Sequence, residues 1–340
     1  MQTFDWNNYK DKIFNKYDDI EVLILNEKNR MITKDYIKKT LNKYGIIHNI
    51  NNIQLFEIAM THEGYVKRDF TELKYFKNIF KGLNIIGNEE IKPINNKNEV
   101  IGLKKISYEL LEFFGDAILR MILTDYLVCR FSRIEDDETN EIGCGKLSSL
   151  RSQIENNSSF SEFCKLIGLN KYILLNRAFE MNNVRDKDIN LQCDVFEAFI
   201  ASLYFDILNI NYFDIAKTKG LIKIERGEAF QKCYDFIINL IEDENYGLDI
   251  CALIEIDTNY KTRLNLYYKN QKWNNPIYPL LETKNVNNKK LYKVGVYDNE
   301  KNIIACSENY SKQEAEKKCA QLALLHFGAL NEYDEYDNNL

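Results

Sequence analysis

Residues that break regular structure are scarce in this 340-residue chain, which contains only 3 prolines and 14 glycines. This scarcity favours long helices over a sheet protein with many tight turns. Apolar residues make up 45% of the sequence, and the length is sufficient for two domains that each bury a core. We therefore expect a mostly folded protein in which helices predominate.

Paired cysteine motifs are absent, although the chain has 8 cysteines, and histidines number only 3. Protein zinc sites are commonly built from Cys-x-x-Cys pairs and histidines. A zinc site is therefore not expected. The cysteines are interpreted as buried, reduced thiols of an intracellular protein.

Targeting signals are also lacking. Residues 1–16 contain no apolar region typical of a secretory signal, and no stretch reaches the roughly 18 uninterrupted apolar residues of a membrane helix. We expect a cytoplasmic or otherwise intracellular protein that is not secreted, has no contact with a membrane and needs no small-molecule cofactor. The net charge of −6 argues mildly against a protein that coats nucleic acid non-specifically. It does not exclude an enzyme that acts on nucleic acid, because metal-binding carboxylates and an acidic tail also lower the total.

Hydrophobic periodicity separates an N-terminal part from the rest of the chain. Residues 1–34 are interpreted as an extension. Residues 70–106, which are rich in Asn and Lys and lack clear periodicity, are interpreted as a long surface insertion. Helical periodicity predicts helices that begin near residues 32 and 55 and helices over 106–131, 147–167, 194–208 and 229–241.

The character of the sequence changes after Asp249. A helix over 257–269, three strands over 278–283, 290–297 and 303–308, and a helix over 311–327 predict a compact α+β unit. Ser311 and Glu314 have the spacing of a capping box at the start of the last helix. The predicted organisation is an extension (1–34), an all-α domain (35–245), a linker (246–255), an α-β-β-β-α domain (256–328) and an acidic tail (329–340).

Acidic residues interrupt two strongly apolar helices of the predicted all-α domain. Glu109, Glu112 and Asp116 are separated by three and four residues, so they share one face of the first helix. Asp194 and Glu197 share one face of the second helix in the same way. Carboxylates on largely buried helices are costly unless positive charge meets them. If the two helices pack together, these carboxylates converge.

A glycine beside these acids supports such packing. Gly115 lies inside the first helix, where glycine costs ~1 kcal/mol relative to alanine, so we expect it to permit close approach of another backbone. Two like charges ~4 Å apart repel by ~4 kcal/mol at an effective dielectric constant of about 20, so converging carboxylates require cations. An all-oxygen cluster suits Mg²⁺ or Mn²⁺ rather than zinc. Such a site can activate water for attack on a phosphodiester.

Simpler interpretations of the same acids are available. Glu109 and Glu112 can be acids of a first helical turn that complement the helix dipole. Asp194 and Glu197 can form an N-terminal capping box. Each pair taken alone is therefore weak evidence of function.

Four motifs in the order of the chain resemble the ribonuclease III family. They are THEGY at 61–65, ELLEFFGDAIL at 109–119, GKLSSLR at 145–151 and DVFEAFI at 194–200. The resemblance covers about residues 35–245 and implies an all-helical endonuclease domain. It implies that double-stranded RNA is hydrolysed on both strands with Mg²⁺, or Mn²⁺ as a substitute, leaving 5′-phosphates and short 3′ overhangs.

The resemblance also implies roles for individual residues. The metal-binding catalytic acids would be Glu112, Asp116, Asp194 and Glu197, with Glu109 as an accessory acid and Phe113 at a dimer interface. His62 is interpreted as a satisfied structural histidine rather than a catalytic one. Lys146 and Arg151 are compatible with contact to the RNA backbone and equally with a solvated helix face.

The downstream unit resembles a double-stranded RNA-binding domain in the segments YKTRL at 260–264, PIY at 276–278 and SKQEAE at 311–316. That fold reads the shape of A-form RNA through phosphates and 2′-hydroxyls. The resemblance implies that RNA is contacted by Lys261, Thr262, Asn265, Lys289, Lys312, Lys317 and Lys318. Asn265 is shorter than the usual glutamine, and Leu266 cannot accept a hydrogen bond from a 2′-hydroxyl. Binding is therefore expected to be weak and strongly dependent on salt.

The sequence also predicts an assembly, and it leaves one alternative function open. The chain carries one set of acids, whereas cutting both strands of a duplex in one encounter needs two, so a homodimer is expected. The alternative function is a catalytically silent dimeric protein that binds and sequesters double-stranded RNA. Loss of one of the four acids would indicate that alternative, and none is lost.

Overall fold

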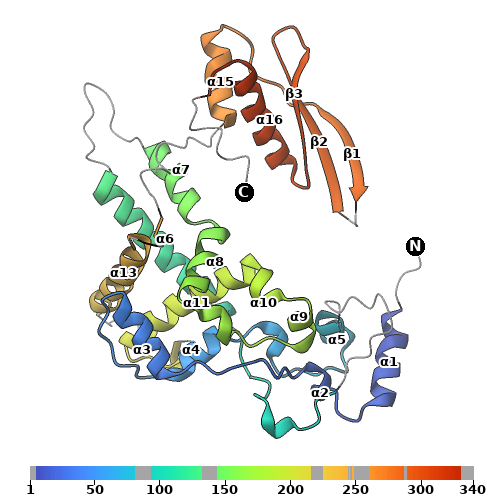
Figure 1. Cartoon of the computed structure of the whole chain (residues 1–340), viewed down its shortest axis with the longest axis vertical. Coiled ribbons are helices and arrows are strands. Elements are labelled where there is room, and N and C mark those ends of the chain that lie inside the picture. Colours follow the sequence, from blue (N-terminus) through green and yellow to red (C-terminus); the bar gives the residue numbers. More distant parts are fainter. Residues whose placement is uncertain are drawn as a thin grey trace. The chain divides into compact units, whose positions relative to one another are not determined.

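The chain divides into two compact units, Met1–Leu248 and Asp249–Leu340, of which the first is helical and the second is α+β (Figure 1). The computed structural model describes residues 5–80, 93–131, 144–215, 225–243, 245, 247–248, 260–286 and 289–330. This is the predicted fold class. Within the described part, no helix is both long and apolar enough to cross a membrane.

The described helices of the first unit range from single turns to the 23 residues of α6. They are α1 (Trp6–Lys16), α2 (Glu21–Ile24), α3 (Lys34–Lys43), α4 (Ile53–Ala59), α5 (Leu73–Phe80), α6 (Glu109–Phe131), α7 (Cys144–Ile154), α8 (Asn157–Leu166), α9 (Arg177–Met181), α10 (Val184–Lys187), α11 (Ile189–Ile207), α12 (Tyr212–Ile215) and α13 (Gly227–Ile241). Short 3-10 turns lie at Glu63–Tyr65, Lys97–Glu99 and Leu169–Tyr172.

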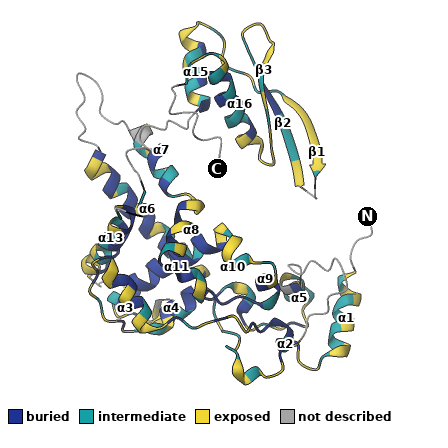
Figure 2. Cartoon of the chain, viewed as in Figure 1, coloured by how far each residue is buried: buried dark blue, intermediate teal, exposed yellow. Residues whose placement is uncertain are grey.

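Helix α11 is the centre of the first unit. Every residue from Leu191 to Asp206 is buried except Asp194, and α4, α6, α8 and α13 all pack against this helix (Figure 2). The helix begins five residues before the predicted start, because the Asp188 side chain caps it by accepting hydrogen bonds from the amides of Asn190 and Leu191. Asp194 and Glu197 therefore lie within the helix rather than at its N-terminus, and their interpretation as a capping box was wrong.

Two other predicted boundaries also differ from the structure. Helix α6 begins at Glu109 rather than at residue 106, so Glu109 and Glu112 do lie in its first turn. The predicted helix over 147–167 is two helices, because the Asn156 side chain accepts a hydrogen bond from the Ser159 amide and starts α8 as a new helix. The acidic segment at 135–138 lies outside the described residues.

The N-terminal extension and the described part of the insertion share a second, smaller core. Phe76 and Phe80 of α5 are completely buried, and the Tyr9 ring of α1 lies 5.9 and 6.3 Å from theirs. Leu23 and Ile24 of the extension belong to the same cluster. The interpretation of 70–106 as surface was therefore wrong for α5. The spacing of four residues between Phe76 and Phe80 was a helical signal that the Asn- and Lys-rich composition obscured.

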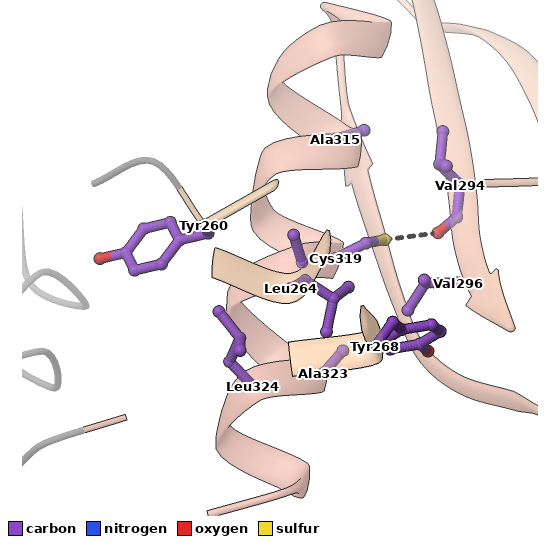
Figure 3. Close-up of a cluster of buried hydrophobic side chains, with 10 residues drawn as sticks. Tyr260, Leu264, Tyr268, Val294, Val296, Ala315, Cys319, Ala323 and Leu324 are labelled. Carbon is purple, nitrogen blue, oxygen red and sulfur yellow. Dashed lines mark hydrogen bonds between the residues drawn. The ribbon is translucent and has the colours of Figure 1, made fainter. Parts of the chain in front are cut away.

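The second unit is a three-stranded antiparallel sheet in the order β1-β2-β3 with two helices. Its elements are α15 (Tyr260–Asn270), β1 (Leu280–Val286), β2 (Lys289–Tyr297), β3 (Ile303–Asn309) and α16 (Lys312–His326). Leu264 of α15, Val294 of β2 and Ala323 of α16 meet in its core, where the Cys319 thiol donates to the Val294 carbonyl (Figure 3). The order α-β-β-β-α is the predicted one, and Ser311 caps α16 as expected. The predicted turn at 287–288 and most of the predicted linker and tail lie outside the described residues.

Candidate active site

Gly115 places the two acid-bearing helices in direct backbone contact. A Cβ atom at this position would lie 1.9 Å from the carbonyl oxygen of Glu197 and 2.5 Å from its carbonyl carbon. Every side chain larger than hydrogen would separate α6 from α11. The predicted close approach of a second backbone is confirmed, and that backbone belongs to Glu197, one of the four acids.

The four acids differ in exposure at this helix crossing. Glu112, Asp116 and Asp194 are half-buried, whereas Glu197 is 8% exposed. Glu109 lies on the exposed edge of α6, and its carboxylate accepts a hydrogen bond from the Ser107 hydroxyl at 2.9 Å.

Burial and mutual repulsion raise pKa values in this cluster. Burial, together with the charges of Asp116, Asp194 and Glu112, raises the pKa of Glu197 to about 8, against the Cys193 hydrogen bond. The pKa values of Glu112 and Asp194 are also raised, in both cases chiefly by burial. The charges of the other three acids therefore act on Glu197 at the helix crossing. Among the described residues, ligand atoms of Asp194 and Glu197 lie within 4.8 Å of each other.

Few positive groups balance these charges. Among the described residues, Arg120 is the only basic side chain paired with any of the four acids, and it contacts Asp116 at 3.1 Å. The Arg120 guanidinium also approaches Glu155 at 3.9 Å, so Asp116 shares its charge. The cluster therefore retains a negative charge that a divalent cation can neutralise. The carboxylate oxygens fit hard cations such as Mg²⁺.

A tyrosine that sequence reasoning missed holds one of the acids in place. The Tyr108 hydroxyl donates to Oδ2 of Asp194 at 3.0 Å, and only 6% of Tyr108 is exposed. Burial and the Asp194 charge raise the pKa of Tyr108, so the phenol stays protonated as a donor. Its position directly before Glu109 was visible in the sequence, but the direction of its side chain was not.

Two residues of the THEGY motif at 61–65, Thr61 and His62, contact Tyr108. The Tyr108 amide donates to the Thr61 carbonyl at 3.0 Å, and the ring of His62 lies 6.0 Å from the Tyr108 ring. Nδ1 of His62 accepts from the Gly64 amide at 3.0 Å. Burial lowers the pKa of His62 to about 4, so the imidazole is neutral at physiological pH. These contacts are those of a structural histidine.

Comparison with known proteins identifies the family. The ribonuclease III domain matches residues 109–207, and the double-stranded RNA binding motif matches residues 260–326. Ribonuclease 3 of Campylobacter fetus subsp. fetus is 30% identical over 215 residues, which cover 63% of this chain and 81% of that protein. The chain belongs to the ribonuclease III family. These matches support activity as a double-stranded RNA endoribonuclease, and none of them favours a silent RNA-binding protein.

Other members of the ribonuclease III family and one solved structure are also similar. A probable ribonuclease 3 of Acanthamoeba polyphaga mimivirus is 26% identical over 321 residues, or 92% of this chain, and the chain spans half the length of that protein. The solved nuclease domain of ribonuclease III from Campylobacter jejuni is 20% identical, with a TM-score of 0.40, and the match covers 64% of this chain and all of that domain.

Several residues assigned to RNA from the sequence have partners within the protein. Lys261 contacts Glu316 at 2.7 Å and lies 5.0 Å above the ring of Tyr278, while Lys312 lies 3.8 Å from the same glutamate. Glu316 thus holds two of the predicted RNA-binding lysines, and sequence reasoning missed it.

The other assigned residues differ in exposure and in partners. Thr262 and Lys289 are exposed, and Asn265, Lys317 and Lys318 are half-buried. In the first unit, Arg151 contacts Glu155 at 3.5 Å and donates to the Thr124 hydroxyl at 2.9 Å. The Lys146 side chain lies outside the described part.

Proposed function

We propose that this chain hydrolyses both strands of double-stranded RNA with a divalent cation held by Glu112, Asp116, Asp194 and Glu197. The observation that carries the proposal is the backbone contact at Gly115, which joins the two acid-bearing helices. Among the described residues, Arg120 is the only basic side chain that pairs with any of the four acids. Family membership supplies the reaction and its expected products, 5′-phosphates and short 3′ overhangs. Mg²⁺ is the expected cation and Mn²⁺ a substitute, because the donors are carboxylate oxygens.

The side chains around the proposed cation have separate tasks. A bound divalent cation would lower the pKa of water and stabilise charge on the phosphate. Glu197, protonated at neutral pH because its pKa is raised to about 8, would lose its proton when a cation binds. Tyr108 fixes Oδ2 of Asp194 and would thereby orient the carboxylate as a ligand. Glu109, on the exposed edge, can act as an accessory acid toward solvent or RNA.

Assembly as a homodimer is part of the proposal. Helix α6 exposes an apolar stripe in which Phe113 is 74% exposed, Met121 61%, Val128 45% and Leu110 41%. Exposed apolar side chains gathered along one helix are typical of a protein interface. A two-fold dimer through this face would supply one set of acids for each strand of the duplex.

The second unit would hold the duplex by its phosphates. We assign this task to Lys261, Thr262, Asn265, Lys289, Lys312, Lys317 and Lys318, within a domain spanning about 256–328. The catalytic domain would span 35–245, preceded by the extension 1–34 and followed by the linker 246–255, with an acidic tail at 329–340.

Cleavage of a long duplex RNA by the purified full chain tests the proposal. Mg²⁺ should permit cleavage and a chelator should abolish it. Glu197→Gln should abolish cleavage while duplex binding persists, because the binding residues lie elsewhere. Glu162→Gln, at an exposed position of α8, is the matched control. Cleavage by the Glu197→Gln protein at the rate of the unmodified protein would refute the assignment, and a wild-type protein that binds duplex but never cleaves would favour the silent alternative.

A further inference from the structure

A thiol lies against the carboxylates of the proposed cation site. Sγ of Cys193 is 3.4 Å from Oε1 of Glu197, and ligand atoms of Cys193, Asp194 and Glu197 all lie within 4.8 Å of one another. These three residues follow one another along one face of α11, which fixes their spacing. The proposed reaction has no task for a thiol.

The Glu197 carboxylate is short of partners at this point. Only 8% of Glu197 and 3% of Cys193 are exposed. Among the described residues, the Cys193 thiol is the only hydrogen-bond donor to Glu197, and Sγ also lies 3.7 Å from Oδ1 of Asn157. The single thiol proton can serve one acceptor at a time, so among the described residues the two carboxylate oxygens of Glu197 have at most one donor between them. A carboxylate with so few donors is a ready ligand for a cation.

The separation of the donors suits a small tetrahedral cation. Bonds of about 2.3 Å from zinc to sulfur and about 2.1 Å to oxygen, at a tetrahedral angle, place sulfur and oxygen ~3.6 Å apart. The observed distance from Sγ to Oε1 is 3.4 Å. We propose that Cys193, Asp194 and Glu197 form a site for a thiophilic divalent cation, Zn²⁺ or Cd²⁺, whose occupancy excludes the catalytic cation.

The chemistry of the donors separates the two kinds of cation. A thiolate prefers Zn²⁺ or Cd²⁺, whereas Mg²⁺ requires oxygen ligands. Binding would release the thiol proton to solvent and form a bond from sulfur to the metal. Because Asp194 and Glu197 would serve both cations, the two compete. Only this competition rests on the proposed function. The expectation that zinc would not bind relied on the absence of Cys-x-x-Cys pairs. That criterion does not detect a site made of one cysteine and two carboxylates.

Titration of the full-length protein with Cd²⁺, without Mg²⁺ or RNA, tests the site directly. The background is the double variant Cys129→Ser with Cys306→Ser, which removes the two exposed thiols of the described chain. This protein should develop the near-ultraviolet charge-transfer band of a thiolate bound to cadmium at about one equivalent. Adding Cys193→Ser should abolish that band. Its persistence there, or its absence from the background protein, would overturn the site.

Two further measurements control for misfolding of the Cys193→Ser variant and test the site separately from the proposed function. Glu197→Gln in the same background keeps the thiol, and it should weaken Cd²⁺ binding at least ten-fold, whereas unchanged binding would contradict the shared ligand. Mg²⁺ at saturating concentration should raise the apparent dissociation constant for Cd²⁺ in proportion to its excess. A cadmium band without any Mg²⁺-dependent cleavage would refute the nuclease and leave the thiophilic site standing. Full cleavage with the site saturated by Cd²⁺ would refute the exclusion.

Discussion

At the scale of single residues, the Gly115 contact sets the most stringent requirement on the sequence. Gly115→Ala inserts a methyl group where the Glu197 carbonyl lies at 1.9 Å, so the helices must separate. We expect a loss of at least the ~1–3 kcal/mol typical of overpacking, measured by urea denaturation. Gly145→Ala in α7 is the control, because nothing lies within 4 Å of the added carbon, and helix propensity should make it neutral or stabilising by up to ~1 kcal/mol. Equal stability of the two variants would contradict the close contact.

Tyr108 is expected to act on the cation through Asp194. Tyr108→Phe removes the hydroxyl that donates to Oδ2 at 3.0 Å and retains the packed ring. Loss of such a supporting hydrogen bond typically costs about 10–100-fold in metal affinity or activity. The Mg²⁺ concentration for half-maximal cleavage should rise accordingly, with Mn²⁺ as a partial rescue. Tyr36→Phe, which removes a hydroxyl bonded to the Ile167 carbonyl, should leave the Mg²⁺ requirement unchanged. A parallel change in both variants would indicate general loosening of the fold.

The raised pKa of Glu197 predicts how pH affects the stability of the metal-free protein. A carboxyl whose folded pKa is about 8 and whose unfolded pKa is near 4.5 binds its proton more tightly in the folded state. Its stabilising contribution is complete below about pH 4.5 and disappears as pH rises through about 8. The melting temperature in chelator should therefore fall between pH 5.5 and 8.5. Glu197→Gln should flatten this decline, and saturating Mg²⁺ should reverse it. A decline that is as steep in Glu197→Gln would assign it to other groups.

Much of the site was predictable at this scale because the acids and Gly115 stand out in apolar helices. The spacing of the acids on each helix, and the need for a second backbone at Gly115, follow from helical geometry. The contacts of Tyr108, Cys193 and Glu316 do not follow from helical geometry, because residues of these types are common in and beside helices. Their roles depend on which side chains the fold places next to them.

At the scale of elements, the helices and strands that were predicted occur in the predicted order, while several ends were wrong and some helices were not predicted. Helix α11 starts at Ile189 because Asp188 caps it, although the apolar period was clearest from Asp194 onward. Helix α5 was missed because its burial depends on α1, which lies about 60 residues earlier in the chain. Local periodicity indicates a helix, but long-range packing decides where it ends and whether a polar segment is buried.

Helix α16 carries a charge arrangement that should limit RNA affinity. Glu316 contacts both Lys261 and Lys312, so these lysines must leave it to meet phosphate. Glu316→Gln should therefore tighten duplex binding, measured with the full chain in chelator. The slope of log K against log salt should steepen by up to ~0.9 for each additional phosphate that a released lysine neutralises, a value from B-form DNA. Glu314→Gln changes the net charge equally at an exposed position without a lysine partner among the described residues. Identical increases in affinity for both variants would show that the change in net charge, and not the release of the two lysines, explains the tighter binding.

At the scale of the whole molecule, we expect the exposed stripe of α6 to form the dimer interface. The chain has a mass of 40.2 kDa and carries one set of acids, while a duplex presents two strands. Light scattering at micromolar concentration should give about twice that mass. Phe113→Ala removes the most exposed ring of the stripe, and a central aromatic of an interface typically contributes at least ~2 kcal/mol, or about 30-fold in the dissociation constant. Dilution should then produce monomers at concentrations where the unmodified protein remains dimeric.

The consequence for cleavage distinguishes this dimer from an incidental one. If each copy cuts one strand, Phe113→Ala should lower double-strand cleavage more than nicking, because a monomer brings one set of acids to the duplex. The control is Ile47→Ala, which removes an 86% exposed apolar side chain outside α6 and should change neither mass nor products. A wild-type protein that is monomeric yet cuts both strands in one encounter would contradict the two-fold assembly. A dimer unaffected by Phe113→Ala would place the interface elsewhere, and the stripe of α6 would then need another partner.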